Sequence, residues 1–200
     1  MIRRDHSTCR GGTFSIALRC AHDVPTSVLG LMPMSTASHA DVLRRLAERY
    51  TEQLRVALGD RLVSVVLFGS VARGEASQGS DIDLYIVAEG LPTGHFARKR
   101  LLAGADAAFQ SDLSDAEARG VEPRLARIVR TPEEAARVRP LYLDMTEDAV
   151  ILHDKDGFFS TVLDRVRASL RRLGSKRVWL ENGWYWDLKP DFKAGEIIEV

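Results

Sequence analysis

The chain has 200 residues, 45% of them hydrophobic, and its 28 basic and 28 acidic residues give a formal net charge of zero. This composition is typical of one globular domain, with room for an appendage. The charge balance argues against a nonspecific nucleic-acid binder or a membrane-surface protein. No apolar run approaches the roughly 20 residues that a spanning helix needs, so we expect no membrane partner.

The first 36 residues carry little organised pattern. The segment "GGTFSIALRCAHD" is interrupted by polar residues and lacks the continuous apolar stretch of a signal peptide. We expect residues 1–36 to be disordered or to be a mis-annotated N-terminus, with the true start at Met32 or Met34. The two cysteines, Cys9 and Cys20, have no neighbouring His/Cys cluster. They fit neither a disulfide framework nor a zinc site, which favours a reducing, cytoplasmic setting.

Organised pattern begins at Ser38, which with Asp41 resembles a capping box. Apolar residues then recur at helical spacing, which predicts an amphipathic helix over residues 39–58. The β-branched run 62–68 predicts a buried strand, and residues 81–89 predict a second one.

The rest of the chain alternates between helical and extended patterns. We predict a helix over 94–118, interrupted near Gly104; a strand over 124–129; a short helix beginning at Thr131-Pro132; a strand over 149–154; and an amphipathic helix over 157–173.

The tail differs in composition from the rest of the chain, because all three tryptophans fall within residues 179–186. Asn182-Gly183 is a strong turn dipeptide, so a β-hairpin is predicted here. The tryptophans could serve as a packing anchor for the tail. With Lys189 nearby, they could instead border a bound nucleotide or an acceptor.

Two carboxylates stand out in the second strand. Asp81 and Asp83 are two residues apart, so they point to the same face. Burying both as ions is costly unless a cation compensates them. Mg²⁺ prefers oxygen ligands, typically one or two carboxylates together with substrate phosphates. An Asp-x-Asp pair alone is more often a solvated edge strand, so its surroundings decide between the two interpretations.

The first strand ends in a turn that suits a phosphate. Gly69 allows the following backbone to approach a ligand closely. The Ser70 hydroxyl and the backbone N–H groups of the turn could hold phosphate oxygens, and Arg73 could add a charge-assisted contact.

These features follow one another in a fixed order around the stretch "GSVARGEASQGSDIDL", residues 69–84. The first strand ends at a Gly-Ser pair, ten residues follow, and Asp-Ile-Asp then opens the second strand. This stretch resembles the signature of the DNA polymerase beta-like nucleotidyltransferase superfamily, and most closely its minimal nucleotidyltransferase (MNT-type) branch. The resemblance implies an α/β (α+β) fold in which helices back a small mixed β-sheet. It implies a nucleotidyltransferase domain over residues 37–155, with residues 156–200 adding a C-terminal helix and a Trp-rich, hairpin-like tail.

The resemblance also implies an activity. Asp81 and Asp83 would be catalytic and would hold two Mg²⁺ ions, while Gly69, Ser70 and Arg73 would bind the triphosphate of ATP or another NTP. A nucleoside monophosphate, AMP in the first instance, would pass to an acceptor and pyrophosphate would leave.

Active members of the superfamily usually add a third carboxylate from a neighbouring strand. Here the corresponding position holds Ala126 or Arg127. Glu122 is an alternative metal ligand if that strand starts earlier, and Asp144 is an alternative catalytic residue on a segment that could run beside the sheet. If neither serves, Arg127 and Arg130 could form salt bridges to the aspartate pair and leave a degenerate site.

Two functions follow from these features. One is an enzyme that transfers an NMP to a protein, such as a toxin in an antitoxin-type role, to an RNA end or to a small molecule. The other is a nucleotide-binding or partner-binding module that kept the fold and lost the transfer. The expected partners are the NTP, the acceptor and, in a homo-oligomer, a second copy of the chain.

Overall fold

The computed structural model describes residues 38–181, 183–193 and 196–198. The expectations for residues 1–36, for both cysteines and for Asn182 of the turn dipeptide lie outside the described residues. Among the described residues, no helix is both long enough and apolar enough to cross a membrane.

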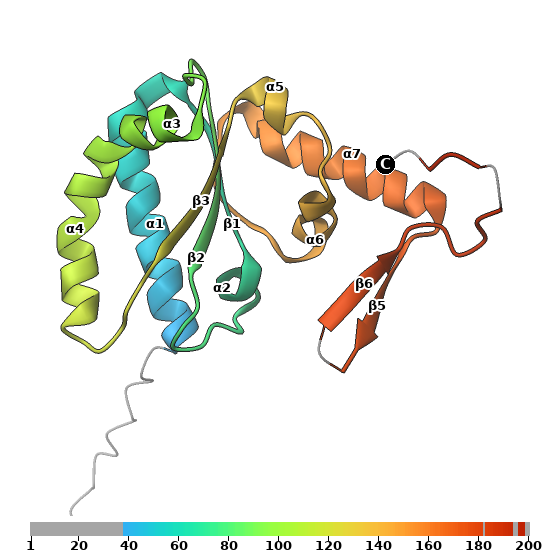
Figure 1. Ribbon diagram of the computed structural model, residues 1–200, viewed down its shortest axis with the longest axis horizontal. Helices are drawn as coiled ribbons and strands as arrows, with labels where there is room; N and C mark the ends of the chain where they lie inside the picture. Colours follow the sequence, from blue (N-terminus) through green and yellow to red (C-terminus); the bar gives the residue numbers. More distant parts are fainter. Residues whose placement is uncertain (1–37, 182, 194–195, 199–200) are drawn as a thin grey trace, which may run out of the picture. The chain divides into compact units, whose positions relative to one another are not determined.

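Helices and strands alternate along the described part of the chain (Figure 1). The helices are α1 (His39–Leu58), α2 (Gly69–Arg73), α3 (His95–Leu101), α4 (Ala103–Glu117), α5 (Pro132–Ala135), α6 (Pro140–Asp148) and α7 (Phe158–Leu173), with 3-10 turns at Gly59–Arg61 and Lys155–Gly157. The strands are β1 (Leu62–Phe68), β2 (Ile82–Ala88), β3 (Leu125–Arg130), β4 (Val150–Asp154), β5 (Lys176–Leu180) and β6 (Gly183–Asp187).

The first four strands form one mixed sheet in the order β3-β2-β1-β4. β1 is antiparallel to both β2 and β4, while β3 runs parallel to β2. Helices α3 and α4 make the crossover that a parallel pair requires. Helices cover both faces of the sheet, with α1 and α4 on one side and α5, α6 and α7 on the other (Figure 1). The prediction of a small mixed sheet backed by helices is confirmed.

One face of the sheet packs on α1 and α4. Alternate residues of β1 and β2, such as Leu67 and Leu84, meet Leu43 and Tyr50 of α1 and Phe109 of α4, and all of them are fully buried. The capping box predicted at Ser38 is present, with the Asp41 N–H donating to the Ser38 hydroxyl at 3.1 Å.

The other face packs on α5, α6 and α7. Here Tyr85 of β2 meets Tyr142 of α6 and Phe159 of α7, with ring centroids 5.2–5.6 Å apart. The Tyr142 hydroxyl donates to the Ala135 carbonyl at 2.9 Å, so the 2.6 Å contact between the two tyrosine hydroxyls is donated by Tyr85. Asp81 and Asp83 have the same parity along β2 as Tyr85 and therefore point to this face.

The helical region 94–118 is interrupted at Leu102, near Gly104 as predicted, and the Leu102 side chain is buried in the core. Residues 140–148 form helix α6, which the sequence did not predict.

The hairpin of β5 and β6 is a separate two-stranded antiparallel sheet, as the pattern of the tail predicted.

Candidate nucleotide and metal site

The candidate site lies where β1 ends and β2 begins. Phe68, the last residue of β1, pairs with Asp83 of β2, and Gly69 follows with φ at +75°. A Cβ built on Gly69 would overlap the Asp83 carboxylate. Glycine is therefore required here for two reasons, its left-handed backbone and its contact with that carboxylate.

Helix α2 carries the other residues of the predicted phosphate turn. Ser70 and Arg73 lie at its second and last positions, and Gly74 ends the helix in the left-handed conformation. The first N–H groups of a helix have no acceptor within the helix, so the start of α2 presents donors next to Asp83. The structure thus brings Gly69, Ser70 and Asp83 to one end of the sheet.

The two aspartates differ in burial. Asp81 is exposed and immediately precedes β2, whereas Asp83 is half-buried within it. Burial raises the pKa of Asp83, the Asp81 charge raises it further, and Arg73 opposes both effects. No hydrogen bond or ion pair reaches either carboxylate from any residue that the structure describes. The carboxylate oxygens of Asp81 and Asp83 are therefore available to bind a ligand.

A divalent cation fits this donor set. Burial and the nearby Asp81 charge raise the pKa of Asp83, so keeping Asp83 ionised is costly, and a hard cation removes that cost. The described residues contain no group of three or more His, Cys, Asp or Glu side chains placed to hold a metal. A cation held by Asp81 and Asp83 would need further oxygens from substrate or water.

The sheet register identifies the residue at the expected place of a third carboxylate. Ala126 of β3 pairs with Asp83, so its side chain lies beside that carboxylate on the same face. Arg127, the next residue, points to the opposite face. There its guanidinium binds Asp106 of α4 and the Tyr50 hydroxyl of α1. The alternative in which Arg127 pairs with the aspartate pair is wrong, because Asp106 neutralises it.

The two other predicted acids lie on a loop and on a helix, and Asp144 lines a cavity together with Gly69 and Arg73. Glu122 is exposed in the loop before β3, which starts at Leu125 rather than earlier. Asp144 lies on α6, where one carboxylate oxygen accepts the indole N–H of Trp184 at 2.6 Å and that of Trp186 at 2.9 Å. Neither belongs to a three-ligand group with Asp81 and Asp83 within the described residues.

Sequence reasoning left the position of the hairpin open. The Arg73 guanidinium lies over the Trp184 ring, 5.0 Å from its centroid, which places the hairpin beside the phosphate turn. The three tryptophans within eight residues were the available signal. The contact of Trp184 with Arg73 spans more than a hundred residues of sequence, so no local pattern reveals it.

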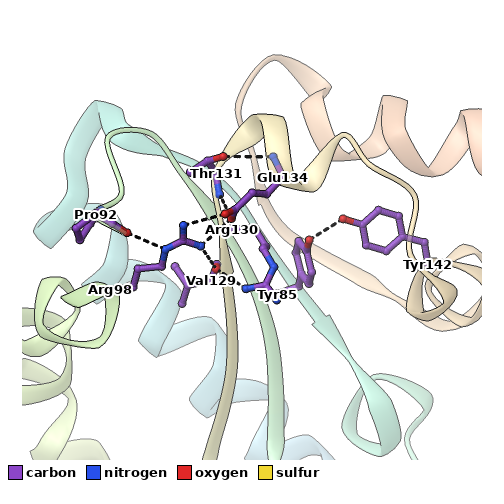
Figure 2. A network of polar contacts seen from close by, with 8 residues as sticks. All are labelled: Tyr85, Pro92, Arg98, Val129, Arg130, Thr131, Glu134 and Tyr142. Atoms are coloured by element: carbon purple, nitrogen blue, oxygen red, sulfur yellow. Dashed lines mark hydrogen bonds and ion pairs between the residues drawn. The ribbon is translucent and has the colours of Figure 1, made fainter. Parts of the chain in front are cut away.

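A second charged group lies at the far end of the sheet (Figure 2). The Arg98 guanidinium donates two hydrogen bonds to Glu134, at 2.7 and 2.9 Å, and others to the carbonyls of Pro92 and Val129. This contact lowers the pKa of Glu134 to about 2. Arg130 donates to the Val129 carbonyl and does not reach the aspartate pair. Arg98 therefore ties α3 to α5 through Glu134 and to the edge strand β3 through the Val129 carbonyl.

A glycine turn against a pair of unpaired carboxylates is an arrangement that could bind a phosphate-bearing ligand together with a cation. The chain belongs to the nucleotidyltransferase domain family, whose model matches residues 48–195. It is accordingly a nucleotidyltransferase, an enzyme of nucleoside monophosphate transfer, and the resemblance found in the signature is confirmed.

The chain is also similar to individual known proteins. The chain is 25% identical over 149 residues to "Putative protein adenylyltransferase MJ1305" of Methanocaldococcus jannaschii, covering 74% of this chain and 95% of that protein. A solved structure described as "a putative nucleotidyltransferase from Sulfolobus solfataricus" is 22% identical, covers 62% of this chain and 94% of its own, and has a TM-score of 0.38. A toxin-antitoxin structure with AMP-PNP is 17% identical, with coverages of 64% and 92% and a TM-score of 0.37. TM-scores in this range carry no argument about the present chain.

Proposed function

We propose that the chain transfers the adenylyl group of ATP to a hydroxyl group of a protein, with Mg²⁺ held by Asp81 and Asp83. The observation that carries this proposal is the aspartate pair, unpaired within the described structure and in contact with the glycine of the phosphate turn. ATP and a protein acceptor are proposed because the Methanocaldococcus relative is described as a protein adenylyltransferase.

The chain's own residues would divide the work as follows. Gly69 leaves room for the triphosphate beside Asp83, and Ser70 and the first N–H groups of α2 donate hydrogen bonds to its oxygens. Arg73 contributes positive charge. When bound, Mg²⁺ would neutralise the phosphates and polarise the reacting oxygens.

The transfer balances without any oxidant or reductant. The acceptor oxygen forms a bond to the α-phosphorus of ATP, the bond from that phosphorus to the bridging oxygen breaks, and pyrophosphate leaves with the electron pair. The hydroxyl proton must go to a base. Ala126 supplies none beside Asp83, so the proton passes to water or to a carboxylate of the acceptor protein.

A second function is favoured by the same alanine. Without a third carboxylate the site could bind MgATP and a partner without transferring AMP. Against this, a binding module has no chemical need for two unpaired aspartates on one strand, because removing their charges would relieve repulsion and desolvation. We therefore place transfer first and the binding module second.

The test uses the full chain with Mg²⁺, ATP labelled at either the α- or the γ-phosphate, and the product of the neighbouring gene as acceptor. A protein acceptor of this kind would give the chain an antitoxin-type role if the acceptor is a toxin. We expect the α-label to appear on the acceptor and the γ-label not to appear. Parallel reactions with RNA and with small hydroxyl compounds test the other acceptors.

The variants decide the assignment of residues. Asp81→Ala/Asp83→Ala should abolish labelling, whereas the exposed Asp115→Ala on α4 should label like wild type. Equal labelling by the double variant would overturn the metal assignment. Calorimetric binding of MgATP without labelling of any acceptor would establish the binding module instead.

A further inference from the structure

The C-terminal hairpin is fixed to helix α6 by two carboxylates. Trp184 and Trp186, on one face of β6, both donate to Asp144. One helical turn further on, Asp148 receives two hydrogen bonds from Arg177 of β5, at 3.1 and 2.8 Å. Tyr185, between the two tryptophans, points to the opposite face and is 51% exposed. The hairpin therefore has one anchored face and one open face.

Trp184 is the point where this anchored face reaches the phosphate turn. The Arg177 guanidinium lies 4.0 Å and the Arg73 guanidinium 5.0 Å from its ring centroid. Arg73 also forms an ion pair with Glu75 at 2.7 Å, and its side chain is only 20% exposed. Arg73 thus lies between the indole of Trp184 and the neighbouring Glu75, one turn of helix from Ser70.

A hollow joins these elements. A cavity of about 190 Å³ is lined by Gly69 and Arg73 on one side and by Asp144 and Asp148 of α6 on the other. Ligand sites usually measure about 300–1,000 Å³, so this hollow is too small to hold a nucleotide. It places the hairpin's anchor directly behind the phosphate turn, on the same face of the sheet as Asp83.

An arginine side chain has many rotamers, and holding it in one place before the ligand arrives improves binding. Aromatic faces provide such a hold because the ring attracts the cation without consuming its N–H donors. The donors that do not contact Glu75 stay available for phosphate oxygens. Trp184 in turn is oriented by the hydrogen bond from its indole nitrogen to Asp144.

We propose that Trp184 is a positioning residue that holds Arg73 for the triphosphate, and that Asp144 acts through Trp184 rather than as a third catalytic carboxylate. The C-terminal hairpin is then part of the nucleotide site and not only a packed appendage. This inference rests on the proposed function in one respect, namely that Arg73 contacts the triphosphate.

The first experiment measures MgATP binding to the full chain by calorimetry. Trp184→Leu should raise Kd about three- to tenfold, the range expected from losing a cation–π contact. Tyr185→Leu, an aromatic loss on the opposite face of the same strand, should leave Kd within about twofold. Trp184→Phe keeps a ring for Arg73 and should restore most of the affinity. Equal Kd values for wild type and Trp184→Leu would overturn the proposal.

Two variants distinguish a positioning role of Asp144 from a catalytic one. Asp144→Asn keeps an oxygen that accepts the indole N–H, so Kd and transfer should stay within about twofold of wild type. Asp144→Leu should behave like Trp184→Leu. A loss of transfer in Asp144→Asn, with unchanged Kd for MgATP, would show instead that Asp144 is a catalytic carboxylate.

A spectroscopic measurement covers the case in which a variant folds poorly. All three tryptophans lie in the hairpin, so the indole N–H signals of a nitrogen-15-labelled chain report on this element alone. MgATP should shift the Trp184 signal in wild type and not in Arg73→Ala. No shift in a wild type that binds MgATP would overturn the inference and leave the proposed function standing. Absence of MgATP binding by wild type would overturn the proposed function itself.

Discussion

Two charged groups on neighbouring strands are built in opposite ways. On β3, Arg127 is matched by Asp106 and by the Tyr50 hydroxyl, which itself donates to Asp106 at 2.7 Å. At the start of β2, Asp81 and Asp83 repel each other, Arg73 offsets this only in part, and neither carboxylate has a hydrogen bond or ion pair within the described residues. The two groups lie on opposite faces of the same sheet.

Whether a charged group has partners distinguishes a structural charge from a functional one. A partly buried charge with matched partners destabilises the fold when one partner is removed, and it has no capacity left for a ligand. A partly buried charge without partners weakens the fold and is retained for what it binds. Changes to the first group should alter stability and leave nucleotide binding intact, and changes to the second should do the reverse.

The largest effect is expected at the unpaired group. Asp83→Asn should lower the rate of nucleotidyl transfer by about 10³-fold, because a ligand of the proposed Mg²⁺, which would neutralise the phosphates, is lost. Without metal, the same variant should be at least as stable as wild type, because a half-buried charge and its repulsion with Asp81 are removed. Initial rates and thermal unfolding measured side by side check both parts. Lower metal-free stability would contradict the comparison.

The matched group should show the opposite behaviour. Arg127→Met leaves Asp106 without its partner, and breaking a buried pair costs about 3–5 kcal/mol. The Asp106 side chain is 33% exposed, so we expect a smaller loss of about 2–3 kcal/mol in the free energy of unfolding. Urea denaturation measures it. The Kd for MgATP should not change, and a change larger than about threefold would show that the two groups are coupled.

A smaller effect is expected from adding a third carboxylate to the aspartate pair. Ala126→Asp places a carboxylate beside Asp83, where the register puts Ala126. If the missing base limits the rate, transfer should rise about tenfold, the low end of what a positioned base contributes. Ala126→Asn is the matched control, since it has similar size and no charge. A rise in the asparagine variant as well would exclude proton transfer as the cause.

The smallest effect is expected at the partly buried pair of Arg98 and Glu134 in Figure 2. Arg98 holds the pKa of Glu134 at about 2, below its usual 4.5, so this pair stabilises the fold above pH 4.5 and the contribution disappears as pH falls toward 2. Glu134→Gln should cost about 0.5–1 kcal/mol at pH 7, because the pair is partly solvated. Urea denaturation at several pH values should show the difference vanishing near pH 2. If the difference in unfolding free energy between wild type and Glu134→Gln stayed the same at every pH, the lost stability would come from the helix cap at Thr131 and not from the ion pair.

Much of the fold could be predicted from local pattern. The strands at 62–68 and 82–88, the capped helix at 39–58 and the hairpin carry periodicities and caps that depend on neighbouring residues only. Helix α6 was missed because it is short and the Arg139 side chain before it provides no cap. The glycine turn and the aspartate pair were predicted for the same local reason, since both lie within sixteen residues of sequence.

The remainder of the site depends on register and distant contacts. Sequence could not decide between Ala126 and Arg127, because the face of β3 depends on its pairing with β2. It could not assign Asp144, whose indole partners lie about forty residues later in the chain. Such contacts arise from tertiary packing and leave no periodic pattern.

The position of β4 has a consequence for synthesis of the chain. β1 is central in the sheet, yet its second neighbour, β4, comes more than eighty residues later, with Ser64 paired to Asp154. Until the ribosome has released residue 154, one edge of an apolar strand lacks its partner, and unpaired edges invite association with other chains. Slowed translation downstream of β3 should therefore increase aggregation of nascent chains, and binding of the edge by a chaperone should prevent it.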